Sequence, residues 1–420
     1  MNKKIIIVTF VVLGLILTAL VARRGAKAAP TGLPLQKANR QEELGVSEIT
    51  DTAFRRIVEE YEAYVEEALA KENVPGAAVA IIKDGKIAYL RGFGLKETGT
   101  KDSVDVHTVF RLASLSKGFA PVLTGVLVED DILEWDDQVI RYVPDFRLRD
   151  QKSTQALNLR HILSHTTGLP RHAYSNLLND GLDYEQIVCK LKDVKLPYAV
   201  GKHHDYQNVA YSLIGDVIAN STGSSYNELL NERIFKPAGM KDASAGYNAI
   251  MASPNVALPH GVSRNGYFPM DISPRYYSAS PAAGVNASIY DMAQWLRLLM
   301  GHHPEVIKKE TLHEIFTPQV TMPLRESTLY QWRPLERAWY ALGWRVMERS
   351  DSQRLIYHGG FVNGYRGEVA FSPEDQIGIV ILSNAVSNFI SESAPRFFDL
   401  YWYLYPSLAP ESELPQLSLK

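Results

Sequence analysis

Ser114-Leu115-Ser116-Lys117 places a hydroxyl and an amine three residues apart, directly before an apolar run. On a helix, positions i and i+3 lie on one face, so the Lys117 amine can take the proton of the Ser114 hydroxyl as it attacks a carbonyl. This is the chemistry of a serine acyl-transfer enzyme. The motif alone also fits a capped helix with a solvated lysine, so other residues must decide.

Three further stretches follow this motif. They are Leu-Glu-Trp-Asp-Asp at 133–137, Tyr-Val-Pro-Asp-Phe at 142–146 and Leu-Arg-His-Ile-Leu-Ser-His-Thr-Thr-Gly-Leu-Pro at 159–170. With these stretches, the chain resembles the serine β-lactamase superfamily, in the branch of class C β-lactamases, DD-carboxypeptidases, D-aminopeptidases and related esterases. The resemblance spans about residues 74–385 and implies a serine hydrolase that forms an acyl-enzyme.

The family also has a Tyr-x-Asn element, for which this sequence offers two candidates. They are Tyr174-Ser175-Asn176 and Tyr206-Gln207-Asn208. Only the second is followed by an apolar, helix-like stretch, as in the family. We therefore assign Tyr206 as the third catalytic residue, with Asn208 placed to hold Lys117 or the substrate amide. The first triplet is interpreted as ordinary loop chemistry, because it lies in a polar segment rich in Asn and Gly.

The third element of class C enzymes is Lys-Thr-Gly, but this chain has His358-Gly359-Gly360. The His-x-Gly form resembles the carboxypeptidase, aminopeptidase and esterase members. Histidine, with an ordinary pKa of about 6.5, is mostly neutral at pH 7 and does not offer a substrate carboxylate the permanent cation of a lysine. We therefore expect weak β-lactam hydrolysis, with the imidazole on the rim of the pocket and the two glycines allowing substrate backbone to approach the strand.

The resemblance implies that Ser114 is the nucleophile, that Lys117 is its base and that Tyr206 relays protons to the leaving group. A solvated lysine has a pKa of about 10.4, so burial and neighbouring groups must lower it. We expect Tyr206 to be a phenolate, favoured by Lys117 and a helix amino end. The resemblance assigns the oxyanion hole to the backbone amides of Ser114 and Phe361, where one donor contributes about 3–4 kcal/mol.

Helices and strands are expected in separate parts of the chain. Helical periodicity is present at 51–71, 389–405 and through much of 114–284, and β-rich runs are present at 77–83, 86–91, 342–346, 367–371 and 377–382. Asp84-Gly85 is a strong hairpin signal. Pro121 lacks the amide that would bond to the Lys117 carbonyl, so we expect a kink in the helix that follows Ser114. The pattern predicts an α+β fold of two lobes, in which a central antiparallel sheet is built from both chain ends, flanked by helices, with a mostly helical region inserted in the middle.

The first 28 residues contain an uncharged apolar run at 5–22 between basic residues and end in Ala26-Lys27-Ala28. This is typical of an export signal or a single membrane anchor. We expect an exported protein, periplasmic or secreted, that residues 5–22 could hold at a membrane. Removal of residues 1–28 deletes five positive charges and no acid, which changes the formal net charge from −3 to −8. An acidic body argues against nucleic-acid binding.

Domain boundaries follow from these patterns. We expect a linker at 29–50, a catalytic domain at 51–405 and a C-terminal tail at 406–420. Within the domain, the sheet lobe comprises about 51–113 and 285–405, and the helical lobe comprises about 114–284.

The sequence predicts no metal and no cofactor. His161 and His165 stand four residues apart, but no third ligand is evident. Cys189, the single cysteine, cannot form an intramolecular disulfide and is interpreted as a buried apolar side chain.

The leading hypothesis is an exported serine hydrolase that cleaves a peptide-like amide or β-lactam in a small-molecule or peptide substrate. The alternatives are an esterase for short acyl esters and a membrane-anchored penicillin-binding sensor with little turnover. The sequence leaves the oligomeric state open.

Overall fold

A computed structural model describes residues 45–327 and 329–408 of the chain. The expected signal or anchor, most of the expected linker and residues 409–420 lie outside this part. Within it, no helix has both the length and the apolar character that a membrane span requires. Residues 406–408, at the start of the expected tail, lie in helix α16 (Tyr405–Leu408), in which the Tyr405 hydroxyl donates to Asp51 and the Tyr405 ring packs edge-on against Phe54.

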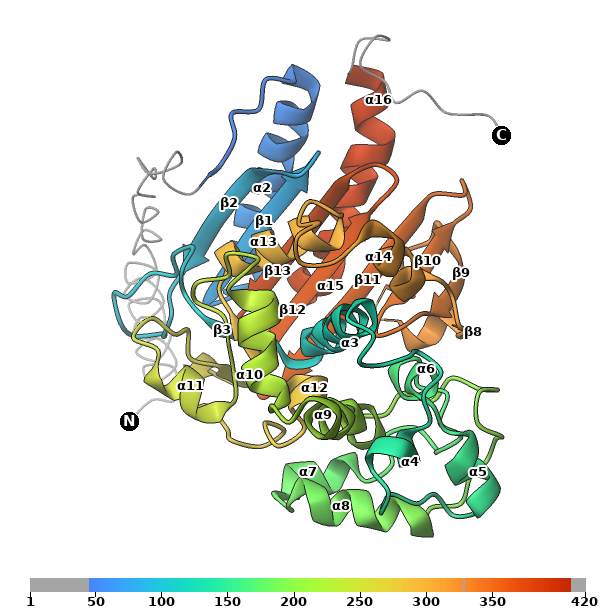
Figure 1. The fold of residues 1–420 in the computed structure, drawn as a ribbon. Helices are drawn as coiled ribbons and strands as arrows, with labels where there is room; N and C mark the ends of the chain where they lie inside the picture. Colours follow the sequence, from blue (N-terminus) through green and yellow to red (C-terminus); the bar gives the residue numbers. More distant parts are fainter. Residues whose placement is uncertain (1–44, 328, 409–420) are drawn as a thin grey trace, which may run out of the picture. The chain divides into compact units, whose positions relative to one another are not determined.

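The core of the described fold is an antiparallel sheet of eight strands that both ends of the chain supply. Its order is β2–β1–β13–β12–β11–β10–β9–β8 (Figure 1). The strands are β1 (Gly76–Lys83), β2 (Lys86–Gly94), β8 (Val320–Thr321), β9 (Leu335–Tyr340), β10 (Arg345–Arg349), β11 (Arg354–Val362), β12 (Tyr365–Ser372) and β13 (Ile377–Ser383). In the pairing of β1 with β13, Ala77 stands opposite Ser383. The predicted α+β fold, with one sheet assembled from the two chain ends, is confirmed.

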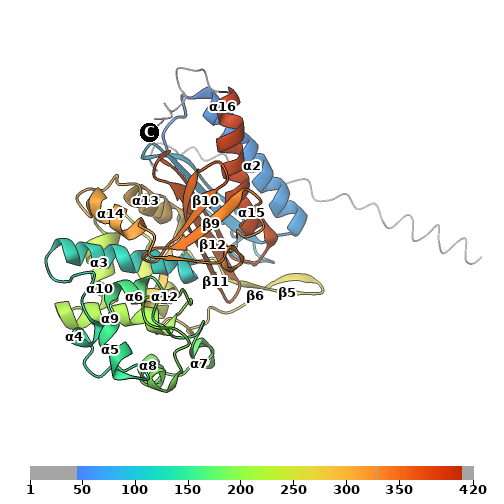
Figure 2. The ribbon, with the colours of Figure 1, turned by 90° about the vertical axis from the view of Figure 1, so that its right-hand side faces the viewer.

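Helices cover both faces of the sheet (Figure 2). On one face, α2 (Thr52–Glu72) and α15 (Asn388–Asp399), which continues into the π-helix η5 (Leu400–Leu404), pack on Ala77, Val79 and Ile81. The other face packs on α13 (Ile289–Leu299), α14 (Lys309–Phe316) and α3 (Phe119–Glu129) through alternate residues such as Ala78 and Ala80. The continuous apolar run of β1 is therefore explained by burial on both faces.

The inserted region is mostly helical, as predicted. It contains α4 (Val139–Tyr142), α5 (Gln151–Ala156), α6 (Leu159–Leu163), α7 (Ser175–Asp180), α8 (Tyr184–Lys190), η2 (Leu191–Asp193), α9 (Val209–Thr222), α10 (Tyr226–Leu230), η3 (Asn231–Phe235), α11 (Tyr247–Ala252) and α12 (Ser280–Ala283). A small sheet of β3 (Phe110–Arg111), β7 (Val285–Ala287) and β4 (Ser244–Ala245) lies where this region leaves and rejoins the larger sheet, and β5 (His260–Ser263) and β6 (Gly266–Pro269) form a separate hairpin.

Two local expectations were wrong. The predicted strand at 342–346 is mostly a bend, because Gly343 adopts a φ of +74° and the strands β9 and β10 end and begin on either side of it. Cys189 is exposed, because Tyr184, Ile187 and Leu191 form the buried face of α8 and its extension, and residue 189 lies off that face.

Candidate active site

Ser114 and Lys117 lie in a 3₁₀ turn, η1 (Ala113–Gly118), that leads directly into α3. The sequence predicted an α-helix here. In a 3₁₀ turn, residues i and i+3 are eclipsed. The side chains of Ser114 and Lys117 are therefore aligned more closely on one face of the turn than they would be on an α-helix. Ala113, which connects β3 to this turn, has a φ of +52°, a strained conformation of the kind that functional sites retain.

Pro121 explains how the turn is held. Its missing amide leaves the Lys117 carbonyl without the usual helical donor, and the Tyr211 hydroxyl on α9 donates to that carbonyl at 2.6 Å instead. The Gly343 bend lies against the same point, since a Cβ at Gly343 would stand 2.8 Å from both the Lys117 carbonyl oxygen and the Tyr211 hydroxyl. The expected kink is therefore a change from a 3₁₀ turn to an α-helix, fixed by α9 and by the bend after β9.

The Lys117 amine is fully buried and has two hydrogen-bond partners. Its Nζ donates to Asn208 Oδ1 at 2.8 Å and to the Ala282 carbonyl at 3.0 Å. A neutral amine has two N–H groups and one lone pair. Because both partners are acceptors, the lone pair of a neutral Lys117 remains available to accept a proton.

Burial and the neighbouring Arg345 guanidinium hold the pKa of Lys117 well below its usual range. No carboxylate contacts the amine among the described residues, so its two neutral hydrogen-bond partners are not joined by a negative charge that would stabilise the ammonium form. The electrostatics therefore favour the unprotonated lysine that the sequence required for a base.

Tyr206 joins the same cluster from the residues that precede α9. Ser114 interacts with its phenol, and its ring centroid lies 4.6 Å from Lys117 Nζ. Burial raises the pKa of the phenol, which Arg345 and Ser114 only partly oppose. This direction argues against the expected phenolate and favours a phenol that can donate a proton.

His358 lies behind this cluster and not on its rim. The imidazole is fully buried, with its ring centroid 6.4 Å from that of Tyr206. Its Nδ1 lies 2.8 Å from the Gly359 carbonyl and its Nε2 lies 3.2 Å from the Tyr340 hydroxyl. A carbonyl only accepts, so Nδ1 carries the proton and Nε2 accepts from Tyr340. Burial and Arg345 hold the pKa of His358 well below 6.5, so the imidazole is neutral.

The opposite wall of the site is an open stretch of β11. Strand β10 pairs with β11 only up to Tyr357, which stands opposite Arg345, so residues 358–362 have no strand partner on that side among the described residues. Gly360 lies against the nucleophile turn, because a Cβ there would be 2.4 Å from the Leu112 carbonyl oxygen. Phe361, at the end of this edge, has a side chain that is 63% exposed. The oxyanion hole formed by the amides of Ser114 and Phe361 stays a prediction.

Several contacts around the site were not predicted from the sequence. Three of the residues that make them, His165, His172 and Tyr276, have a positive φ. The His165 Nδ1 accepts from the Gln207 amide, the His172 amide donates to the Tyr206 carbonyl, and the Tyr276 hydroxyl donates to the Ser175 carbonyl. The triplet at 174–176 is thus more than loop chemistry, because Asn208 Nδ2 lies 3.4 Å from Ser175 Oγ. The sequence carried no signal for these contacts, which depend on loops folding onto each other.

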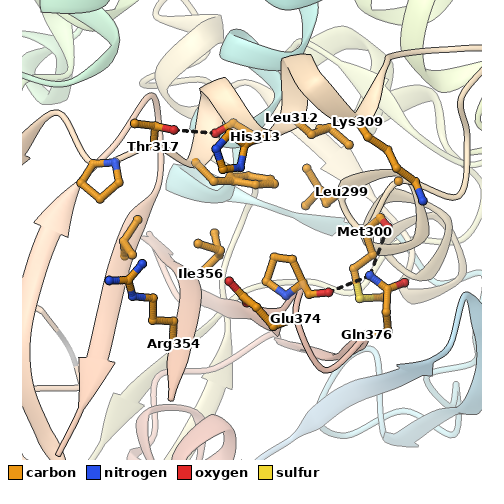
Figure 3. Close-up of a pocket in the computed structure, with 15 residues that line it drawn as sticks. Leu299, Met300, Lys309, Leu312, His313, Thr317, Arg354, Ile356, Glu374 and Gln376 are labelled. Carbon is orange, nitrogen blue, oxygen red and sulfur yellow. Dashed lines mark hydrogen bonds between the residues drawn. The ribbon is translucent and has the colours of Figure 1, made fainter. Parts of the chain in front are cut away.

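The elements that carry the site converge at one end of the sheet. In Figure 1, α3, α9 and α12 lie together below the strands, and η1 contacts both α12 and β11. A separate cavity of about 320 Å³ lies elsewhere, between the ends of α13 and α14 and the turn after β12. Figure 3 shows its lining, which includes Lys309, Phe316, Arg354, Ile356 and Glu374. None of the predicted site residues lines this cavity.

Comparison with known proteins places the chain in a family. The family model described as Beta-lactamase matches residues 61–397. The chain belongs to the β-lactamase family. The class C branch suggested by the sequence stays a prediction.

The relatives are distant. The chain is 22% identical over 340 residues to Protein flp of Staphylococcus aureus (strain MW2), covering 79% of this chain and 64% of that protein. It is 23% identical over 352 residues to Unguisins hydrolase ungD' of Aspergillus campestris (strain IBT 28561), covering 80% of this chain and 63% of that protein. The chain therefore spans less than two thirds of the length of these relatives.

A solved structure shares the fold. The octameric penicillin-binding protein homologue from Pyrococcus abyssi aligns with a TM-score of 0.72 and 24% identity, covering 82% of this chain and 77% of that chain. The β-lactamase fold is thus established for the described residues, whereas activity, substrate and assembly require separate arguments.

Proposed function

We propose that the protein is a serine acyl hydrolase in which Ser114, Lys117 and Tyr206 form and hydrolyse an acyl-enzyme on a peptide-like amide. One observation carries the proposal. The buried amine of Lys117, whose two hydrogen-bond partners are both acceptors, lies 4.6 Å from the ring centroid of Tyr206, and the Tyr206 phenol interacts with Ser114. Such a lysine can serve as a base near neutral pH.

The proposed reaction has two halves. Lys117 accepts the Ser114 proton as Oγ bonds to the substrate carbonyl carbon. The carbon–nitrogen bond then breaks, the leaving amine takes a proton from the Tyr206 phenol, and the proton on Lys117 restores the phenol. Water next attacks the acyl-enzyme, its proton passes through the same groups to Ser114 Oγ, and an acid is released.

Intact-mass measurement tests this proposal on the full-length protein. A panel of acyl-peptides, a chromogenic cephalosporin and nitrophenyl esters should give turnover, and a slow substrate should add its acyl mass to the wild type but not to Ser114→Ala. Ser116→Ala is the matched control, because the Ser116 hydroxyl is buried and accepts from the Val285 amide. Turnover that survives in Ser114→Ala would contradict the assignment, and stable acylation without release would indicate a penicillin-binding sensor.

An esterase for short acyl esters is the second candidate, and His358 favours it. Both nitrogens of this buried imidazole are engaged by Gly359 and Tyr340, so it presents no cation to an acidic substrate. A higher kcat/KM for nitrophenyl esters than for every amide in the panel would support this candidate.

Export is part of the proposal and depends on the sequence alone. The uncharged apolar run at 5–22 between basic residues supports secretion or anchoring at a membrane. Fractionation of cells that express the full-length chain tests it, and recovery of unprocessed protein in the cytoplasm would contradict it.

A further inference from the structure

His165 is buried directly against Tyr206, the proposed proton donor to the leaving group. The residue is fully buried, and the centroid of its ring lies 4.4 Å from that of the Tyr206 ring. Its backbone has a φ of +58°, which is uncommon for residues other than glycine and is retained mainly at functional sites. The proposed reaction uses no atom of His165, so its position needs a separate explanation.

His165 binds the peptide groups on both sides of Tyr206. The Asp205 amide donates to the His165 carbonyl at 2.9 Å, and the Gln207 amide donates to His165 Nδ1 at 3.1 Å. Residues 203–207 form neither a helix nor a strand, so no regular pattern of backbone hydrogen bonds fixes this segment. One residue therefore holds the backbone before and after the phenol.

The bond to Nδ1 determines the protonation state of the imidazole. A backbone amide only donates, so Nδ1 must offer a lone pair, and the proton of the neutral ring lies on Nε2. Burial holds the pKa of His165 well below 6.5, and the neighbouring His204 and Lys117 lower it further. The imidazole is therefore a neutral acceptor at neutral pH, and the bond to Gln207 is kept.

We propose that His165 is a positioning residue for Tyr206, which holds the phenol where it can give its proton to the leaving group. This inference rests on the proposed function and deepens it. The His172 amide also binds this segment, at the Tyr206 carbonyl, but that bond uses backbone atoms alone. A substitution of the side chain at 165 therefore removes the Nδ1 bond and leaves the backbone bonds in place.

The leaving group provides the test, because only some leaving groups need a proton. One acyl group is offered to the full-length protein as an amide, as an ethyl ester and as a nitrophenyl ester. The measured quantity is kcat/KM, which reports on the steps up to acylation. An amine or an alkoxide must take a proton as it leaves, whereas a nitrophenolate leaves without one. A displaced Tyr206 should therefore slow the first two substrates and spare the third.

Two substitutions isolate the Nδ1 bond. His165→Phe keeps an aromatic ring but removes the acceptor for the Gln207 amide. It should lower kcat/KM by about 10- to 100-fold for the amide and the ethyl ester, and by less than about threefold for the nitrophenyl ester. His165→Asn offers an acceptor oxygen near the position of Nδ1 and adopts a positive φ readily, so its rate on the amide should stay within about fivefold of the wild type.

His161→Phe is the matched control. It removes a bond of the same kind, from the Asn158 amide to His161 Nδ1 at 3.3 Å, and should leave the ratio of the amide and nitrophenyl ester rates unchanged. Thermal unfolding shows whether each variant folds. If His165→Phe does not fold, His165→Gln replaces it, because the longer Gln side chain carries its polar atoms beyond the position of Nδ1. His165→Gln should change the ratio of rates in the same way.

A double-mutant cycle shows whether His165 acts through the phenol. In the Tyr206→Phe background, His165→Phe should lower the rate on the amide by less than about threefold, because the group that it positions is already absent. A full additional loss in that background would overturn the inference.

The outcomes distinguish the two proposals. If His165→Phe slows all three substrates alike, or if His165→Asn is as slow as His165→Phe on the amide, the positioning inference is wrong while the hydrolase proposal stands. If the wild type turns over none of the substrates and a fluorophosphonate does not label Ser114, the hydrolase proposal itself fails.

Discussion

A buried lysine becomes a better base at neutral pH because its charged form loses hydration. The surroundings of Lys117 produce this effect. Two neutral carbonyl groups, from Asn208 and Ala282, hold the amine without supplying the negative charge that would keep it protonated. A carboxylate at either position would raise the pKa of the lysine and remove the base. The amide of Asn208 is therefore as important to the proposed chemistry as the amine that it binds.

The lowered pKa of Lys117 predicts a pH-dependent stability difference. Between the folded-state pKa and the ordinary value of 10.5, the unfolded chain binds a proton that the folded chain does not. The free energy of unfolding should therefore rise with pH in this window, by about 1.4 kcal/mol per pH unit, relative to Lys117→Met. Urea unfolding of both proteins from pH 7 to 10 measures it, and a constant difference would show that Lys117 keeps its ordinary pKa.

The phenol of Tyr206 should matter for rate more than for stability. Tyr206→Phe should lower kcat/KM by about 10²- to 10⁴-fold and change the free energy of unfolding by less than about 1.5 kcal/mol. Tyr211→Phe is the matched control, because its hydroxyl contacts only the backbone side of the same turn, at the Lys117 carbonyl. It should cost about 1–3 kcal/mol of stability but less than tenfold in kcat/KM. If Tyr206→Phe and Tyr211→Phe lost the same activity, the Tyr206 hydroxyl would act by holding the structure in place and not by transferring a proton.

Among the elements, the bend between β9 and β10 supports the nucleophile turn from outside the helical region. Gly343→Ala should destabilise the protein by at least about 1 kcal/mol more than Gly239→Ala and should lower kcat more than it raises KM. Both glycines have similar φ values, +74° and +72°, but a Cβ meets the Lys117 carbonyl at 343 and nothing within 4 Å at 239. Thermal unfolding and steady-state kinetics of the two variants check this, and equal effects would show that only backbone strain matters.

Local signals in the sequence explain which elements could be predicted. The Asp84-Gly85 turn has φ values of +50° and +72°, the conformation expected for its residue types, and the alternate faces of β1 are both buried. The prediction of a strand at 342–346 was wrong because apolar periodicity cannot distinguish a strand from a buried bend that contacts another lobe. The contacts of Arg345 and His165 with Tyr206 were missed for a related reason, since they depend on the packing of segments that are distant in the sequence.

At the scale of the molecule, a buried cation connects the C-terminal helix to the sheet. The Arg349 guanidinium lies between the rings of Trp332 and Trp402, at 4.7 and 4.8 Å from their centroids, and pairs with Asp351 and Asp399. Arg349→Met should reduce the free energy of unfolding by about 2–4 kcal/mol, whereas kcat/KM at 25 °C should stay within twofold. Arg354→Met, whose side chain is 56% exposed, is the control and should cost less than about 1 kcal/mol. A large loss of activity in Arg349→Met would show that the contacts of Arg349 also affect the geometry of the active site.

The pairing of Ala77 with Ser383 also constrains how the protein is made. During synthesis, β1 can pair with β2 at once but lacks its β13 partner until β13 has left the ribosome, and contacts so distant along the chain form slowly. Truncated nascent chains that stop before β13 should therefore fail to react with a serine-directed probe, however complete their helical lobe. The catalytic centre should therefore form only after β13 has been translated.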